Sequence, residues 1–340
     1  MQVRLLLAAL LLAPAVFAME MDMGEMQQPL ELHFGGDVNG GKRFGTAAEP
    51  SAFALGVVDT MIHGRLSRAF SVLVEVAYED SGDSFGFDVE RLMLKFEPTT
   101  WFQVSVGRFH TPLGYWNTAY HHARWMYSAT EAPLLDRFED GAGPLPVHTI
   151  GVLVRGAVPV GPVQLEYDLC AGNARGPRPD PPQNFGDTSD AKSACAALHA
   201  EYAGLRFGVS GSLDSATVAP GLDLRERIAV ADLHWRWGGW EAIAEGALIH
   251  HDLGGSVANN LGGFAQLAYE IRDKVQLYGR VERFVRATEE SYLVTPTATF
   301  GLGGVRYDVI STAALKLEGG WEKVAGVEGT TIRGQLAWLF

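Results

Sequence analysis

The chain has 340 residues, of which 47% are hydrophobic and 20% are charged, and its formal net charge is −13. This acidic balance argues against nucleic-acid binding, and a mean hydropathy of +0.03 is far too low for a bundle of membrane-spanning helices. The 40 glycines suit a curved sheet, in which glycine relieves crowding at bends.

Residues 1–18 have the features of a secretory signal peptide. Arg4 is their only charge, an apolar stretch runs from Leu5 to Phe17, and Ala18 is a small residue at the expected cleavage point. The apolar stretch covers about 13 residues, fewer than the roughly 20 that a membrane-spanning helix needs. We therefore expect export, with a mature chain that begins near Met19.

Residues 19–28 form an acidic leader rich in methionine. Thioether sulfur suits Cu(I), so a copper-related role is one interpretation of this segment. The simpler interpretation is an acidic leader without a metal, and we predict neither a metal site nor a cofactor. The methionines and the acids between them are Met19, Met21, Met23, Met26, Glu20, Asp22 and Glu25.

From residue 29 to residue 340 the sequence alternates between apolar and polar side chains. In the segment 163–169, for example, apolar residues at odd positions alternate with Gln164, Glu166 and Asp168. This period of two predicts strands with chemically different faces. Short connections are expected at 67–70, 97–101, 158–162, 203–206, 237–240, 271–274 and 308–312, and longer ones near 39–51, 80–86, 111–146, 171–195, 214–223, 252–259, 286–293 and 324–329.

About sixteen strands of roughly ten residues, joined by turns that are short on one rim and long on the other, predict a transmembrane antiparallel β-barrel. Aromatic residues where strands meet turns fit an interfacial girdle. The chain ends on Phe340 after a strand with one apolar face, which we expect to pair with the first strand at 30–38 and close the barrel. A soluble β-sandwich would show the same alternation but does not explain this terminal strand. The predicted location is the outer membrane of a Gram-negative cell, in contact with lipid and lipopolysaccharide.

Polar side chains on the inward faces predict a water-filled lumen, because unpaired charges cannot remain in a dry core. Acids outnumber bases among them, which favours cations weakly. The charged residues that we expect to line the lumen are Glu75, Arg155, Glu166, Asp232, Arg236, Glu245 and Arg280.

The connection 111–146 is rich in aromatic and charged residues, unlike a solvated surface loop. It is predicted to fold into the lumen as a constriction loop; the alternative is a cap outside the barrel or a contact with a neighbouring subunit. The candidate constriction residues are Tyr115, His121, His122, Arg124, Asp136, Arg137, Glu139 and Asp140.

The two cysteines of the chain flank the connection 171–195. Cys170 ends one predicted strand and Cys195 begins the next. An even pair in an exported protein favours a disulfide over a metal or catalytic site.

The stretch "VSVGRFHTPLGYW" (104–116) resembles the strand-to-loop segment of the phosphate-selective porin family and related bacterial porins. The resemblance covers about a tenth of the chain. It implies a channel of about sixteen strands for small hydrophilic solutes, often as a homotrimer. The lysines expected of an anion-selective member are scarce here, so phosphate selectivity is not carried over.

The sequence thus predicts a porin with weak cation preference. The alternatives are a plugged, non-conducting barrel that acts as a scaffold of an envelope complex, and a copper-related outer-membrane protein. No enzyme is expected: His121 and His122 with Asp136 or Asp140 could be drawn as a hydrolytic set, but no spacing singles out a nucleophile.

Overall fold

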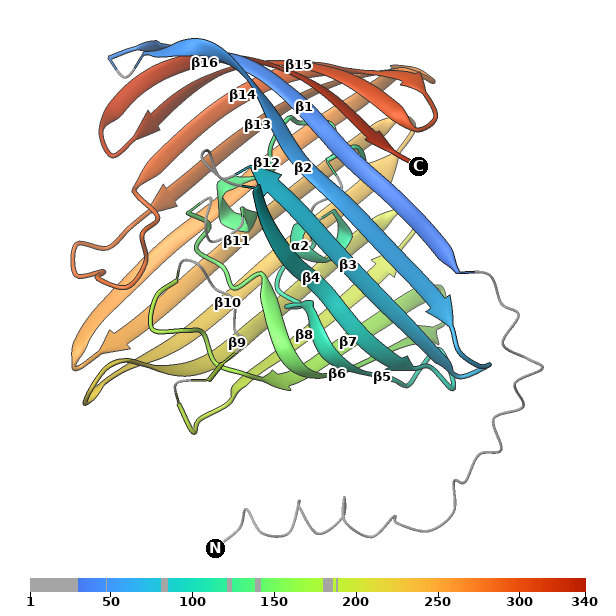
Figure 1. The fold of residues 1–340 in the computed structure, drawn as a ribbon, viewed down its shortest axis with the longest axis vertical. Helices are drawn as coiled ribbons and strands as arrows, with labels where there is room; N and C mark the ends of the chain where they lie inside the picture. Colours follow the sequence, from blue (N-terminus) through green and yellow to red (C-terminus); the bar gives the residue numbers. More distant parts are fainter. Residues whose placement is uncertain are drawn as a thin grey trace, which may run out of the picture.

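The computed structural model describes residues 30–46, 48–80, 85–120, 124–137, 142–179, 186–187 and 189–340. They form one closed antiparallel barrel of sixteen strands in up-and-down order (Figure 1), which confirms the predicted fold class. The strands are β1 (Glu31–Gly45), β2 (Glu49–Arg65), β3 (Phe70–Asp80), β4 (Phe85–Phe96), β5 (Gln103–His110), β6 (His148–Val160), β7 (Val163–Gly172), β8 (Ser193–Tyr202), β9 (Leu205–Ala219), β10 (Leu222–Trp237), β11 (Trp240–Leu253), β12 (Ser256–Arg272), β13 (Val275–Val285), β14 (Ala298–Ile310), β15 (Ala313–Val324) and β16 (Val327–Leu339).

Two short helical turns, α2 (Trp116–Ala119) and η2 (Leu134–Asp136), lie between β5 and β6. Across the described ranges, no helix is long and apolar enough to cross a membrane. The predicted signal peptide and the methionine-rich leader lie outside the described residues.

β1 and β16 close the barrel, with Gly35 opposite Leu339. Phe340 extends the pairing, because its N–H donates to the carbonyl of Phe34 at 2.8 Å and its carbonyl accepts the N–H of Phe34 at 3.2 Å. The predicted pairing of the C-terminal strand with residues 30–38 is confirmed. Closure leaves no strand edge of the barrel unpaired.

The rim that carries both chain ends has short turns, as predicted, but the opposite rim differs from the prediction. Four of its connections expected to be long are tight turns, at 46–48, 220–221, 254–255 and 325–326. Gly221 (φ +73°) and Gly254 (φ +60°) supply the left-handed backbone that two-residue hairpins need. The polar residues that suggested loops are instead the ends of long strands; β12, for example, has 17 residues.

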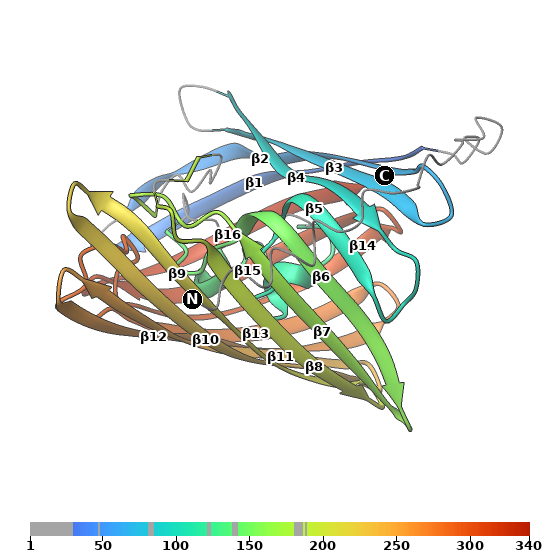
Figure 2. The ribbon, with the colours of Figure 1, turned by 90° about the horizontal axis from the view of Figure 1, so that it is seen from below.

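Exposure alternates along the strands and identifies the two faces of the wall. In β10, residues 224, 226, 228, 230 and 232 are buried and the residues between them are exposed. The exposed face points out of the barrel, and Figure 2 shows the tilted strands that present it. Large exposed aromatic residues near the rim with the chain ends include Trp101, Trp237 and Phe340, as an interfacial girdle requires.

The main apolar core lies inside the barrel. Leu113, Trp116, Tyr127 and Leu135 of the connection between β5 and β6 pack against inward-facing apolar residues of β10–β14. The predicted water-filled lumen is therefore wrong for this side of the barrel. A sixteen-strand barrel is too wide for its wall side chains to fill alone, and here a loop supplies the missing apolar volume.

Candidate functional site

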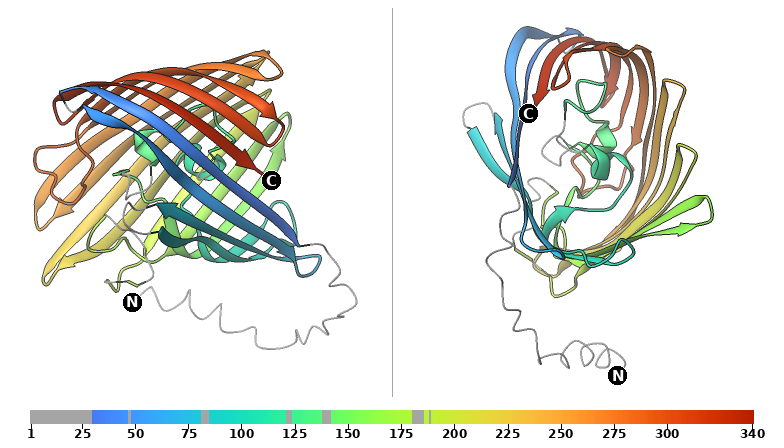
Figure 3. Two further views of the ribbon diagram at one scale, coloured as in Figure 1. Left: turned by 45° about the horizontal axis from the view of Figure 1, so that its top comes forward. Right: turned by 90° about the vertical axis from the view of Figure 1, so that its right-hand side faces the viewer.

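The connection between β5 and β6 lies inside the barrel. Viewed from the right of Figure 1, its helix α2 occupies the space enclosed by the strands (Figure 3, right). Trp116 and Ala129 have no exposed surface, and Ser128 is 1% exposed. The described parts of this connection, 111–120, 124–137 and 142–146, lie on the inner side of the strands.

Carboxylates of the barrel wall accept hydrogen bonds from the loop backbone. Glu245 accepts the N–H groups of Tyr115 at 3.1 Å and Trp116 at 2.5 Å. The preceding Gly114 (φ +71°) makes this approach possible, because a Cβ there would lie 2.0 Å from the Glu245 carboxylate. A buried N–H left without an acceptor is costly, so Glu245 holds the start of the loop on β11.

Two further wall carboxylates hold the middle and the end of the loop. Glu282 on β13 accepts the N–H of Leu134 at 2.6 Å. Glu318 on β15 accepts the hydroxyl of Thr130 at 2.8 Å and its N–H at 3.3 Å. The loop is thus attached to the wall by main-chain bonds at three separated points.

Basic side chains of the wall also hold the loop, by donating hydrogen bonds to its carbonyl groups. Arg280 donates to the Glu131 carbonyl at 3.0 Å, and Lys316 donates to the Ala129 carbonyl at 2.8 Å. Arg306 likewise donates to the carbonyls of Trp125 and Tyr127. These bonds satisfy loop carbonyls that would otherwise be buried without a donor.

The structure places the predicted constriction residues in different surroundings. Tyr115 stacks on His234 with ring centroids 4.3 Å apart, and Arg124 lies 3.5 Å from Asp37 of β1. Asp136 is buried, at 7% exposure, against β10–β13. His121, His122, Glu139 and Asp140 lie outside the described residues.

Two loop carboxyl groups differ in the charge around them. Burial and the neighbouring Glu282 raise the pKa of Asp136 well above its usual value. Although burial opposes ionisation of Glu131 too, Arg137 and Arg333 lower the pKa of Glu131 to about 2. Arg137 lies 3.2 Å and Arg333 2.9 Å from its carboxylate. Glu131 thus keeps its charge near neutral pH, whereas the surroundings of Asp136 oppose its ionisation.

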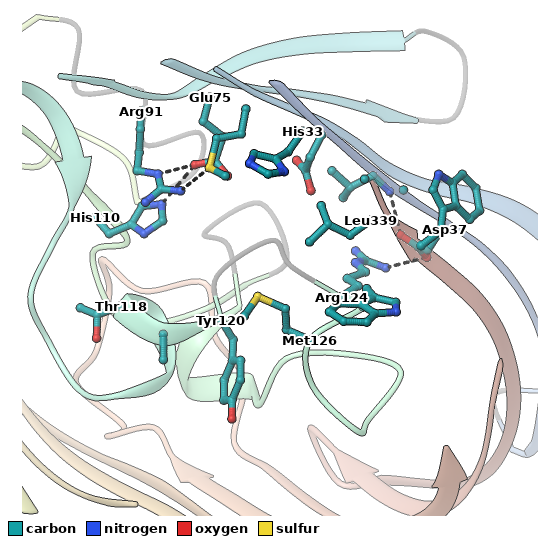
Figure 4. A pocket seen from close by; sticks show the side chains of 18 residues that line it. His33, Asp37, Glu75, Arg91, His110, Thr118, Tyr120, Arg124, Met126 and Leu339 are labelled. Carbon is teal, nitrogen blue, oxygen red and sulfur yellow. Dashed lines mark hydrogen bonds and ion pairs between the residues drawn. The ribbon is translucent and has the colours of Figure 1, made fainter. Parts of the chain in front are cut away.

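Cavities remain on the other side of the loop, beside β1–β6. The first, of about 150 Å³, lies between the loop and the first five strands (Figure 4). Its charged and histidine lining comprises His33, Asp37, Asp59, Glu75, Arg91, His110 and Arg124. A second cavity, of about 110 Å³, shares Arg91 and His110 with the first and extends to Lys95 and Arg155 near the rim with the chain ends.

A third cavity, of about 570 Å³, lies between the loop and the strands β1, β2 and β14–β16, and is bordered by Arg43, Glu131 and Arg333 among others. A hydrogen-bond network lies between it and the first cavity. Gln335 of β16 donates to the Asp37 carboxylate at 3.0 Å and to the Thr130 carbonyl at 3.0 Å. This contact ties the loop to the closing strand pair of the barrel.

The predicted lumen charges all lie on the inward face, and most have a partner of opposite charge or a loop donor. Asp232 and Glu245 are buried on the filled side, at 2% and 4% exposure. Glu166 retains 39% side-chain exposure beside Arg206 at 3.5 Å. The remaining pairs are Glu75–Arg91, Arg155–Asp168 at 3.0 Å, Arg236–Glu241 at 2.5 Å and Arg280–Glu282 at 2.7 Å.

Several loop-holding residues were not among the predicted site residues: Glu282, Arg306, Lys316, Glu318 and Gln335. Their only signal in the sequence is an inward position by alternation. The sequence around each of these residues does not indicate that its partner lies in the distant loop.

The predicted disulfide between Cys170 and Cys195 is present, with Cα atoms 4.9 Å apart, and joins directly opposed residues of β7 and β8. His250 and His251 point to opposite faces, as the strand geometry requires: His250 contacts Asn259 on the outer face, and His251 contacts Glu226 and Glu290 inside. Within the part of the chain that the structure describes, no group of three potential ligands is placed to hold a metal ion.

No protein-family model and no curated protein matches the chain, but its fold is similar to solved outer-membrane proteins. An anion-selective porin from Comamonas acidovorans has a TM-score of 0.67 at 12% identity, covering 92% of this chain and 99% of that chain. OmpF of Salmonella typhi, in complex with daunomycin, has a TM-score of 0.63 at 10% identity, covering 92% and 97% of the two chains. OmpT of Vibrio cholerae in its trimer form has a TM-score of 0.59 at 14% identity, covering 92% and 100%. The chain therefore has a porin-like fold, and the resemblance to the phosphate-selective family stays a prediction.

Proposed function

We propose that this chain is an outer-membrane porin, a passive diffusion channel for small hydrophilic solutes and ions. The observation that carries the proposal is a closed barrel whose inserted loop fills one side of the lumen and leaves polar cavities beside β1–β6. In this proposal residues 111–146 are the constriction loop, and solutes pass between that loop and the first six strands.

The proposal includes a weak preference for cations. It rests on the acid excess predicted for the inward face as a whole, whose field a low-dielectric wall would focus on passing ions. The two cavities beside β1–β6 are themselves balanced, with four carboxylates (Asp37, Asp59, Glu75, Glu97) and four arginine or lysine side chains (Arg91, Lys95, Arg124, Arg155). The preference is weak because Glu245, Glu282 and Glu318 are committed to the loop and are shielded from the path. Acids that keep solvent contact, such as Glu166, contribute most.

The proposed location is the outer membrane of a Gram-negative cell, reached through the predicted signal peptide. The porin-like neighbours, which are outer-membrane proteins, support this location, and the trimer form of the Vibrio cholerae protein supports a homotrimer. We assign no enzyme activity. Asp136, the described member of the hydrolytic set considered above, faces the buried acids of the wall.

Planar-bilayer recording of the purified protein tests the proposal. The wild-type chain should form steady ion-conducting channels. Deletion of Tyr115 to Glu139 should raise the single-channel conductance several-fold, because the strand pairing is untouched and water replaces the apolar filling. An unchanged conductance would place the loop outside the conducting path.

A plugged scaffold barrel is the second candidate. The observation that favours it is the hydrogen-bond network through Gln335, which joins Asp37 of the first cavity to Thr130 of the third. A wild-type chain that conducts nothing, combined with a deletion variant that conducts, would establish this candidate in place of the open channel.

A further inference from the structure

Two of the lumen cavities follow one another along β1. Positions from His33 to Asp37 border the first cavity, and residues 39–43 border the third. Because β1 runs from the rim with the chain ends to the opposite rim, the third cavity lies toward the opposite rim. The change from one cavity to the other falls at Asp37 and Asn39.

One glutamine side chain bridges the wall and the loop where the two cavities meet. Gln335 of β16 lies directly opposite Asn39 in the register and donates to its Oδ1 at 2.9 Å. The same Nε2 donates to the Asp37 carboxylate at 3.0 Å and to the Thr130 carbonyl at 3.0 Å. Asp37 borders the first cavity, whereas Asn39 and Thr130 border the third. Gln335 is 3% exposed and Asp37 is 2% exposed, so solvent is excluded from this junction.

The groups on either side of Gln335 are fixed by other bonds. The Asp37 carboxylate accepts the N–H of Val57 at 3.1 Å, and it rests against β2 so closely that a Cβ on Gly56 would lie 2.1 Å from it. Figure 4 shows Asp37 beside Arg124 at the edge of the first cavity. On the loop side, Glu318 holds the hydroxyl and the N–H of Thr130. Loss of the Gln335 side chain therefore leaves both sides of the junction in place.

The Gln335 amide itself is incompletely satisfied. Its NH₂ group carries two hydrogens but lies within 3.0 Å of three acceptors. Its Oε1 is buried and has no hydrogen-bond partner among the described residues. A buried acceptor without a donor is unfavourable, so rotation of this side chain toward water in either cavity would regain a bond for the oxygen. Gln335 is thus the member of the network that can move most readily.

We propose that Gln335 is the barrier residue of the solute path. Its side chain closes the junction between the first and third cavities, and its rotation joins them into one passage that continues through the second cavity to the rim with the chain ends. This inference rests on the proposed channel function. Passage then depends on one wall side chain, while the loop stays attached through Glu245, Glu282 and Glu318.

Planar-bilayer recording of the full mature chain tests the barrier. Gln335→Ala and Gln335→Ser should each raise the single-channel conductance several-fold, because the side chain that fills the junction is shortened. The matched control is Gln276→Ala. Gln276 of β13 is also a wall glutamine bonded to the loop, since it accepts the Ser128 hydroxyl at 2.7 Å, but it borders none of the three cavities. The control should conduct like the wild type, and heat-dependent gel migration confirms that each variant has folded.

Labelling from each side of the membrane provides a readout that needs no current. Both cysteines of the chain are in the disulfide, so Thr331→Cys, which borders the third cavity, supplies one accessible thiol for a membrane-impermeant thiosulfonate. The reagent should react roughly tenfold more slowly from the rim with the chain ends than from the opposite rim. Adding Gln335→Ala should make the two rates equal.

Three results would overturn the barrier. They are an unchanged conductance of Gln335→Ala in a chain that conducts, an equal rise in Gln276→Ala, and labelling rates that Gln335→Ala does not equalise. A wild type without current removes the open-channel proposal but not the barrier. The labelling rates in Gln335→Ala then decide the barrier alone.

Discussion

Glu245 offers the most direct test of how the loop is held. Its carboxylate accepts two backbone N–H groups, from Tyr115 and Trp116, and is 4% exposed. A buried donor left without its acceptor costs about 1–3 kcal/mol, so Glu245→Ala, which leaves two such N–H groups, should destabilise the docked start of the loop by about 2–6 kcal/mol. Both bonds end on Oε1, so Glu245→Gln, which keeps that oxygen, should cost less.

Hydrogen exchange measured by mass spectrometry reads this loss at the two amides concerned. Because about 1.4 kcal/mol is a factor of ten, a peptide covering residues 113–120 should exchange about 30 to 10⁴ times faster in Glu245→Ala. Local opening governs such exchange. Glu201→Ala is the control: it removes an exposed acid near the other rim and should leave the peptide unchanged. Exchange in Glu245→Ala within threefold of the wild type would refute this role of the carboxylate.

Three further predictions concern the disulfide, the topology and the selectivity. Alkylation of unreduced protein should detect no free thiol, and removing the Cys170–Cys195 bond should lower the free energy of unfolding by about 3–4 kcal/mol in the entropic description; a labelled cysteine would contradict this. An epitope tag at Arg178 should be accessible on intact cells and one at Thr99 should not, and the reverse pattern would invert the barrel. Glu166→Gln should shift the reversal potential in a salt gradient toward anions, since the exposed carboxylate beside Arg206 is lost; no shift would remove Glu166 from the selectivity argument.

Strand count, closure and the disulfide could be predicted because each depends on local periodicity or on a pair of residues. The alternation of β10 or β16 appears in the sequence whatever lies inside the barrel. The tight turns were missed because polar residues at strand ends look the same whether the strand stops or continues into solvent. Gly221 and Gly254 were the available signal for hairpins there.

The partners of the inward residues could not be predicted, because they come from a distant segment. Glu318 and Thr130 are 188 positions apart, and no pattern in either strand or loop reports the bond between them. An inward acid in a barrel has two possible fates: it can face water and act on passing ions, or it can hold an inserted loop. Alternation shows only that an acid faces inward and not which of these two roles it has. The predicted lumen charges therefore included both Glu166, which faces solvent, and Glu245, which holds the loop.

Residues on the filled β10–β14 side of the lumen and residues on the open β1–β6 side should respond differently to substitution. On the β10–β14 side, the ring of Trp116 packs against Phe264 of the wall with centroids 5.7 Å apart and against Tyr127 of the loop at 5.0 Å. A large-to-small change there leaves a cavity in a packed core and destabilises the loop by roughly 3–5 kcal/mol. On the β1–β6 side, the side chains face solvent cavities, and a change such as Lys95→Ala alters the charge of the path without opening a packed core. In the proposed channel, folding and conduction are therefore separable by position: residues of the filled side fix the place of the loop, and residues of the open side determine what passes beside it.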